Sequence, residues 1–317
     1  MQFKQYLFVL GTGRSGTTTC ANMLSSIRGC SITHQMKPTL LREATSYVVG
    51  TMPQNEMVSL LRETRGCVQR GGERISGESN QRLAFVLPAL AEAFPGAKYL
   101  WVIRDGRDAV TSMHHRYWYH PNEAQLRHQE LSEWITNRIR ADQVGQMSTS
   151  KWEKLDSFAR CCWYWAYTNT LIAQTSKKLN LETRCVQLEN LQRDWHSIAQ
   201  FLELKEEDLA EVSHSNRSSS TDRGAWWKNP TPWRHWSPAQ HRVFSHYCGD
   251  VMNKHYPNWG FDPRASLLAS VASFAYRSAK SVCLTTADVS RPLRIRISAM
   301  SMIQAPSTVR DEVTRRA

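Results

Sequence analysis

Gly11-Thr-Gly-Arg-Ser-Gly-Thr-Thr18 is the stretch that decides the fold class of this chain. It follows the short apolar run Tyr6–Leu10, which predicts a buried strand, and it opens Thr17–Ser26, whose apolar positions have helical spacing. A glycine-rich turn between a strand and a helix presents backbone N–H groups and a helix N-terminus to an anion. The stretch therefore predicts a strand–loop–helix unit that binds a phosphate-like group.

A second unit of the same kind lies further along the chain. Phe85–Phe94 predicts a helix that Pro95-Gly96 ends, and Lys98–Ile103 predicts the buried strand that follows. Arg104–Asp108 is then a polar turn before a helix from Ala109. Alternating strands and helices predict a single α/β domain, in which a P-loop-like central parallel sheet is flanked by helices and ligands bind at the carboxyl ends of the strands.

The chain continues this pattern to about residue 260. Residues 119–156 are polar and predict an inserted helical region. We expect the aromatic band that includes Trp163 and Trp165 to pack in the core, because large aromatic side chains are mostly buried. The further predicted elements are a long helix at Ser157–Leu179, a strand at Arg184–Leu188, and helices at His196–Leu204 and from Pro238 to about Lys254.

The composition divides the chain into two parts. Its 317 residues are 41% hydrophobic and 21% charged, as in an ordinary globular enzyme. The net charge of +12 suits a polyanionic ligand. Half of that excess lies after position 263, where nine basic residues stand against three acidic ones. We therefore predict one folded domain at 1–263 and a basic, disordered C-terminal extension at 264–317.

The chain shows no targeting or metal-binding pattern. No charged segment with a long apolar stretch and a cleavage site opens it, and no apolar run reaches the roughly 18 residues of a membrane span. The eight cysteines have no metal-ligand spacing and are expected to be reduced, several of them buried. These features predict a cytoplasmic protein with no membrane span and no bound metal.

The glycine-rich loop differs from that of a nucleotide kinase. The kinase pattern G-x-x-x-x-G-K-[ST] places a lysine directly after its second glycine, where it reaches the β- and γ-phosphates. Thr17 occupies that position here, and the cation of the loop is Arg14 in its middle. A guanidinium can make a bidentate contact with a phosphate or phosphosulfate. The loop therefore favours an anion other than a nucleoside triphosphate.

Gly13-Arg-Ser-Gly-Thr-Thr18 resembles the 5′-phosphosulfate loop of the sulfotransferases, in the Arg form that is typical of carbohydrate and tyrosylprotein members. A second family element is a strand that ends in Arg, with a Ser eight residues later on the next helix. Arg104 and Ser112 match it, and an Arg and a Ser so placed can converge on one dianion, the 3′-phosphate. The resemblance implies the co-substrate 3′-phosphoadenosine 5′-phosphosulfate, no metal, and transfer of a sulfuryl group to a hydroxyl or amine.

Four further segments are similar to the family, so that the resemblance covers most of the chain to about residue 260. They are Gly77-Glu-Ser79, Gln187-Leu-Glu-Asn-Leu191 with Phe201-Leu-Glu-Leu204, Arg223-Gly224 with Trp227-Lys-Asn229, and Tyr256-Pro-Asn-Trp-Gly260. The resemblance implies a donor-binding set of Gly13, Arg14, Ser15, Gly16, Thr17, Thr18, Arg104, Ser112, Arg223 and Gly224. The implied acceptor is a small molecule or a carbohydrate, with no nucleic-acid partner, and the sequence indicates no oligomeric state.

The general base departs from the family pattern. Relatives with the Arg form often carry a carboxylate about 20 residues after that Arg, and this chain has Gln35 there, beside His34. A neutral imidazole suits proton abstraction near neutral pH, so we predict His34 as the base and Arg14 as the second catalytic residue. Glu78 is the rival base. Thr19 stands where the lysine form has an adenine-stacking tryptophan, so the stacking residue is not identified.

Two alternatives to a sulfotransferase stay open at this point. One is an unusual P-loop kinase of a small molecule, against which the missing lysine and the Arg104/Ser112 pair argue. The other is a non-catalytic relative that binds a nucleotide after losing its base, which Gln35 in place of the carboxylate allows.

Overall fold

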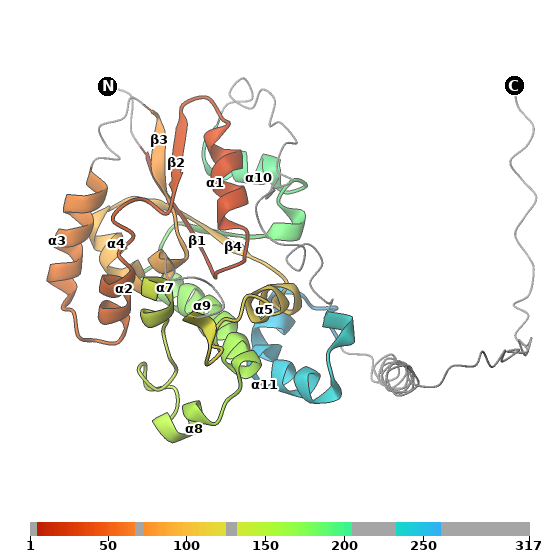
Figure 1. The fold of residues 1–317 in the computed structure, drawn as a ribbon. Coiled ribbons are helices and arrows are strands. Elements are labelled where there is room, and N and C mark those ends of the chain that lie inside the picture. The colour runs from red at the N-terminus through yellow and green to blue at the C-terminus, as the bar shows by residue number, and fades with distance from the viewer. Residues whose placement is uncertain (1–4, 67–72, 125–131, 205–232, 261–317) are drawn as a thin grey trace, which may run out of the picture. The chain divides into compact units, whose positions relative to one another are not determined.

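The structure, a computed structural model, describes residues 5–66, 73–124, 132–204 and 233–260 (Figure 1). Strands and helices alternate through most of this length. In chain order the elements are β1 (Gln5–Gly11), α1 (Thr17–Ser25), β2 (Cys30–His34), α2 (Leu41–Val48), α3 (Gln54–Arg65), β3 (Ile75–Ser79), η2 (Gln81–Val86), α4 (Leu87–Ala93), β4 (Lys98–Ile103), α5 (Gly106–His114), α7 (Ser132–Thr136), α8 (Thr149–Glu153), α9 (Ser157–Lys178), β5 (Thr183–Gln187), η4 (Leu188–Asn190), α10 (Trp195–Phe201), η7 (Trp233–His235) and α11 (Pro238–His255).

The five strands form one parallel sheet in the order β2-β3-β1-β4-β5. Its register aligns the last residues of the strands, because His34 pairs with Ser79 and Ile103 pairs with Gln187. The strands are parallel, so their carboxyl ends and the loops that follow lie at one edge of the sheet. That edge is where α/β sheets bind ligands.

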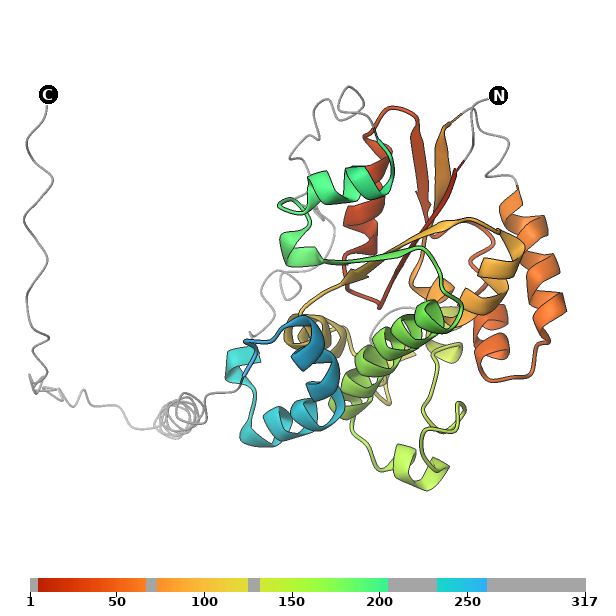
Figure 2. The ribbon, with the colours of Figure 1, turned by 180° about the vertical axis from the view of Figure 1, so that it is seen from behind.

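Each face of the sheet is covered by its own hydrophobic cluster. Successive side chains of a strand point to opposite faces, and in β1 Leu7 belongs to one cluster while Phe8 belongs to the other. In β4 the same alternation separates Leu100 from Trp101. Helices α1 and α10 cover the first face, and α3, α4 and α9 cover the second, as Figures 1 and 2 show from opposite sides.

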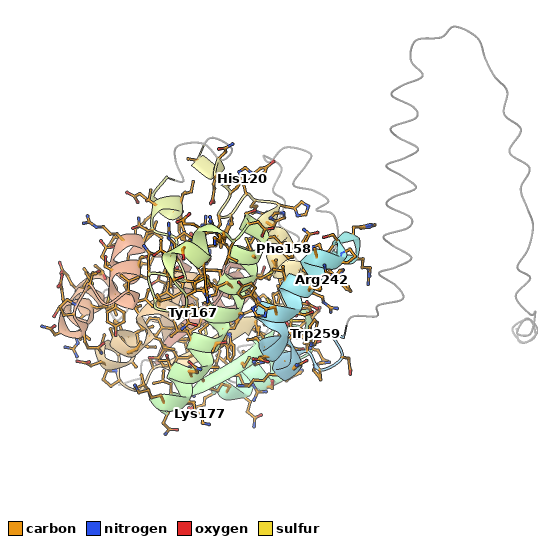
Figure 3. All side chains as sticks on the ribbon, turned by 90° about the horizontal axis from the view of Figure 1, so that it is seen from below. His120, Phe158, Tyr167, Lys177, Arg242 and Trp259 are labelled. Carbon is orange, nitrogen blue, oxygen red and sulfur yellow. The ribbon has the colours of Figure 1, made fainter. Side chains whose placement is uncertain are left out.

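The long helix α9 is the backbone of the second cluster. Asp156 caps its N-terminus by accepting a hydrogen bond from the Ala159 N–H at 2.8 Å, and basic side chains in its last turn face the negative end of the helix dipole. In Figure 3 the helix runs from Phe158 past Tyr167 to Lys177, with α11, marked by Arg242, beside it. Cys162 and Cys248 join the two helices through a contact between the Cys248 thiol and the Cys162 carbonyl at 3.4 Å.

The structure confirms the predicted α/β fold with a central parallel sheet flanked by helices. The strand at Lys98–Ile103 and the core position of Trp163 and Trp165 are also confirmed. The helix predicted from Ala109 begins three residues earlier, at Gly106, because Asp105 caps it by accepting from the Arg107 N–H at 2.9 Å.

Several parts of the chain were not predicted, among them α2, α3, β3 and the structure of the region 119–156. Strand β3 was not recognised, because its sequence ISGES is polar, although all five of its residues are buried. The region 119–156, which was predicted to be helical, contains the short helices α7 and α8 within its described part, and the rest is mainly turns, bends and irregular backbone.

None of the described helices combines the length and the hydropathy needed to cross a bilayer. The predicted extension at 264–317 lies outside the described residues.

Candidate functional site

The glycine-rich loop joins the carboxyl end of β1 to the start of α1. Arg14 has a φ of 69° and Gly16 a φ of 91°, so the loop contains the left-handed backbone turns that gather N–H groups into an anion-binding nest. Gly16 is the N-cap of α1, and in the described residues no side chain caps this helix end and no acidic residue lies in its first turn. The N–H groups of Thr17 and Thr18 thus have no intrahelical partner, and the positive end of the helix dipole faces the loop.

Close packing holds the loop from behind. A Cβ on Gly13 would lie 2.2 Å from Gln81 Oε1 and 2.2 Å from Trp118 Cη2, so these two side chains press against the backbone. Ser15 donates its hydroxyl hydrogen to the Thr12 carbonyl at 2.7 Å inside the loop and is fully buried. The buried Ser15 is therefore a structural member of the loop, whereas Arg14 and Thr18 are accessible to a ligand.

Arg14 in the loop and Arg116 after α5 both contact the hydroxyl of Ser112. Arg14 Nε lies 3.1 Å from Ser112 Oγ, and Arg116 Nη1 lies 2.8 Å from the same oxygen. Arg104 Nη1 donates to the Arg14 carbonyl at 3.2 Å. The structure thus places Arg104 and Ser112 near each other through their contacts with Arg14, and it adds Arg116.

The turn that carries Arg104 is held by the end of the chain's described part. Glu189 accepts a hydrogen bond from the Asp105 N–H at 2.8 Å and another from the Tyr256 hydroxyl at 3.0 Å. Arg107 donates to the Trp259 carbonyl at 3.1 Å. Two of the segments that resemble the sulfotransferases, which contain Glu189 and Tyr256, therefore support the end of β4 from different parts of the sequence.

His34 ends β2 at the same edge of the sheet. Its Nε2 lies 2.9 Å from Thr18 Oγ1, so the predicted base contacts the first turn of α1 directly. Burial is the main influence on its pKa, which it lowers from the usual value, against smaller opposing effects of the Ser79 backbone and the Glu78 charge. The adjacent Gln35, at the position of the expected carboxylate, has a φ of 52° and donates its N–H to the Ser79 carbonyl at 3.0 Å.

Glu78 is a structural carboxylate in this fold. Its side chain is fully buried and forms an ion pair with the buried Arg65, with Glu78 Oε2 2.9 Å from Arg65 Nε. It also accepts from Asn80 Nδ2 at 2.9 Å and from the Met36 N–H at 3.2 Å. With no solvent exposure and at least three donors on its oxygens, Glu78 is enclosed in the fold, which favours His34 over Glu78 as the candidate base.

Two residues of the predicted donor-binding set, Arg223 and Gly224, lie outside the described residues. Arg116 was missed, although it stands four residues after Ser112, the spacing at which side chains of a helical segment come together. Across residues 5–66, 73–124, 132–204 and 233–260, no three His, Cys, Asp or Glu side chains are grouped to hold a metal ion.

Comparison with known proteins gives similarity in structure alone. No protein-family model matches the chain, and no curated protein matches it. Among solved structures, the sulfotransferase domain from the curacin biosynthetic pathway has a TM-score of 0.44 and 14% identity, over 86% of this chain and 99% of that one.

Two further solved structures are similar. Sulfotransferase STF9 from Mycobacterium avium has a TM-score of 0.46 and 11% identity, over 81% of this chain and 78% of that one. Mouse sulfotransferase SULT7A1, complexed with PAP, has a TM-score of 0.43 and 12% identity, over 87% of this chain and 90% of that one. These scores and identities are low, so the function is derived from the residues of the chain itself.

Proposed function

We propose that this chain is a sulfotransferase that uses 3′-phosphoadenosine 5′-phosphosulfate as its donor. The observation that carries the proposal is the contact of Arg14 Nε with Ser112 Oγ at 3.1 Å, between positions 98 residues apart in the sequence. It joins the loop, which lacks the kinase lysine and is the first anion position, to helix α5, which forms the second position together with Arg104 after β4. A ligand with two separate phosphate-type groups accounts for both positions, and a single phosphate accounts for one.

The two positions bind different groups of the donor molecule. The N–H groups at the start of α1, with the Thr17 and Thr18 hydroxyls, hold the 5′-phosphosulfate. Arg104, Ser112 and Arg116 hold the 3′-phosphate, because guanidinium groups bind phosphate oxygens strongly. Arg14 lies between the two sets of binding residues, since its Nε contacts Ser112 while its backbone belongs to the loop.

The chemistry needs one base and one stabilised leaving group. The acceptor hydroxyl oxygen forms a bond to sulfur while the bond from sulfur to the bridging phosphate oxygen breaks, and the bridging oxygen keeps the electron pair. The acceptor proton passes to Nε2 of His34, which is neutral near pH 7 because burial lowers its pKa below the usual value. Arg14 and the loop N–H groups stabilise the charge that develops on the leaving phosphate.

The Arg form of the loop supports a carbohydrate or another small polar hydroxyl compound as the acceptor. The acceptor must place its hydroxyl within hydrogen-bond reach of His34, about 2.6–3.2 Å or one water away. His34 is half-buried at the edge of the sheet, so its ring is reachable from one side.

Titration calorimetry with adenosine 3′,5′-bisphosphate, adenosine 5′-monophosphate and ATP with magnesium tests the donor. The proposal expects the bisphosphate to bind at least tenfold more tightly than the monophosphate. Tighter binding of ATP with magnesium would instead identify a kinase. Transfer of labelled sulfate to a panel of acceptors then separates an enzyme from a non-catalytic relative, which would bind the bisphosphate and show no transfer.

A further inference from the structure

Thr18 is the point at which the donor loop and the base touch. Its Oγ1 lies 2.9 Å from Nε2 of His34, across 16 residues of sequence. Thr18 lies in the first turn of α1, the helix whose N-terminus faces the loop, and it is exposed to solvent on that side. One side chain is therefore within reach of both the donor anion and the base.

As the proposed base, His34 takes the acceptor proton on Nε2, so its neutral ring carries its own proton on Nδ1. His34 is the register partner of Ser79 in β3, and Nδ1 is buried with no hydrogen-bond partner of normal geometry among the described residues. A neutral ring with its proton on Nδ1 has its lone pair on Nε2, and the Thr18 hydroxyl then donates to that lone pair.

We propose that Thr18 couples donor binding to the base, by holding the Nε2 lone pair of His34 until the donor takes the hydroxyl. This inference rests on the proposed function. Threonine has a single hydroxyl hydrogen, which can be donated to His34 or to an oxygen of the phosphosulfate. An anionic oxygen is the stronger acceptor. The arrival of the donor therefore turns the hydroxyl away from the ring and leaves Nε2 open to the acceptor proton.

The consequence is an order of events in which the base becomes available after the donor is in place. The charge that faces His34 from β3 is Glu78, which is paired with Arg65, while Thr18 on α1 carries no charge. Thr18 is therefore a positioning residue, because it acts on the reaction through His34.

Nitrogen-15 NMR of the full chain with labelled histidines tests the coupling. His34 is assigned by comparison with His34→Gln, and adenosine 3′,5′-bisphosphate is added to saturation at a pH above the pKa of the ring. We expect the Nε2 signal of His34 in the wild type to move toward that of an unbonded neutral nitrogen. In Thr18→Val the signal is at that position already and does not move, while Thr18→Ser, which keeps the hydroxyl, behaves as the wild type.

Thr33→Val, an exposed threonine one residue before His34, is the matched control and is expected to respond as the wild type. Thr18→Ala replaces Thr18→Val if the latter does not fold. We expect loss of the hydroxyl to weaken bisphosphate binding by about 10-fold. A saturating concentration of the bisphosphate still fills the site in the variant.

Binding of the bisphosphate with no movement of the His34 signal, or with equal movement in Thr18→Val, overturns the coupling and leaves the donor site intact. Absence of nucleotide binding to the wild type, measured by calorimetry on the same sample, overturns the proposed function together with the coupling.

Discussion

The donor side and the base side of this edge of the sheet are built in different ways. On the proposed donor side, Arg14 follows β1, Arg104 follows β4 and Arg116 follows α5; Arg14 and Arg116 contact the Ser112 hydroxyl, and Arg104 contacts the Arg14 carbonyl. On the base side, His34 is the titratable group with a contact to the loop, and the neighbouring Glu78 is enclosed in a buried ion pair.

This difference predicts unequal responses to substitution. Several donors share the binding of an anion, so losing one of them lowers the affinity by a limited amount. The acceptor proton is transferred to one group, the base, so loss of the base slows every turnover. Four substitutions test this contrast, in order of expected effect.

Replacing His34 with alanine has the largest expected effect on rate. Loss of a general base lowers kcat by about 10²–10⁴-fold, while binding of the bisphosphate should change little. The wild-type rate should rise with pH as the ring becomes neutral, and this limb should lie below a pH of about 6.5 because burial lowers the pKa. The variant should lose that limb. Steady-state kinetics across pH, with Thr33→Val as control, checks this, and full activity of His34→Ala would refute the base assignment.

Replacing Glu78 with glutamine should reduce stability. Removing one partner of a buried ion pair leaves the other charge unpaired and costs about 3–5 kcal/mol of unfolding free energy. Denaturant unfolding measures it, and Arg65→Met combined with Glu78→Gln should recover part of the loss. A stable Glu78→Gln protein with a large loss of kcat would show that Glu78 takes part in the reaction. The base side would then contain two catalytic groups.

Replacing Arg14 with alanine should lower kcat by about 10²–10³-fold, as the loss of one stabilising donor at a developing charge does. The affinity for the bisphosphate should fall less, because the N–H groups of the loop remain. Arg14→Lys keeps the charge without the planar fork and should lie between the two. Single-turnover rates measure the effect on transfer, and calorimetry measures the effect on affinity. An unchanged kcat would show that Arg14 binds the donor without acting in the transfer.

Replacing Arg116 with glutamine should give the smallest effect, in binding alone. A hydrogen bond to a charged group contributes about 1.5–3 kcal/mol, so the affinity for adenosine 3′,5′-bisphosphate should fall by about 10- to 100-fold. Affinity for the 5′-monophosphate should not change. Arg193→Gln, in an exposed ion pair with Asp194, is the control. Equal losses for both nucleotides would place Arg116 at the 5′ group or in the fold.

The sequence by itself determined the parts of this protein whose signal is local. The loop at Gly11–Thr18 and the Arg104–Ser112 unit each combine a strand, a turn and a helix within a few residues, so their spacing already defines where a side chain lies. A parallel sheet then brings the ends of β1 and β4 to one edge, which places the two units side by side, although the contact of Arg14 with Ser112 was not predicted.

The tertiary structure alone decided the role of each group that depends on burial or on a distant partner. Nothing in the local sequence of Glu78 distinguishes a catalytic carboxylate from a structural one, and the choice is made by Arg65 from α3. The contact of His34 with Thr18 likewise requires β2 to end beside the first turn of α1. Solvent exposure and pairing with distant residues determine whether such a group is charged and whether a ligand can contact it. Exposure and pairing are established only when the whole chain has folded.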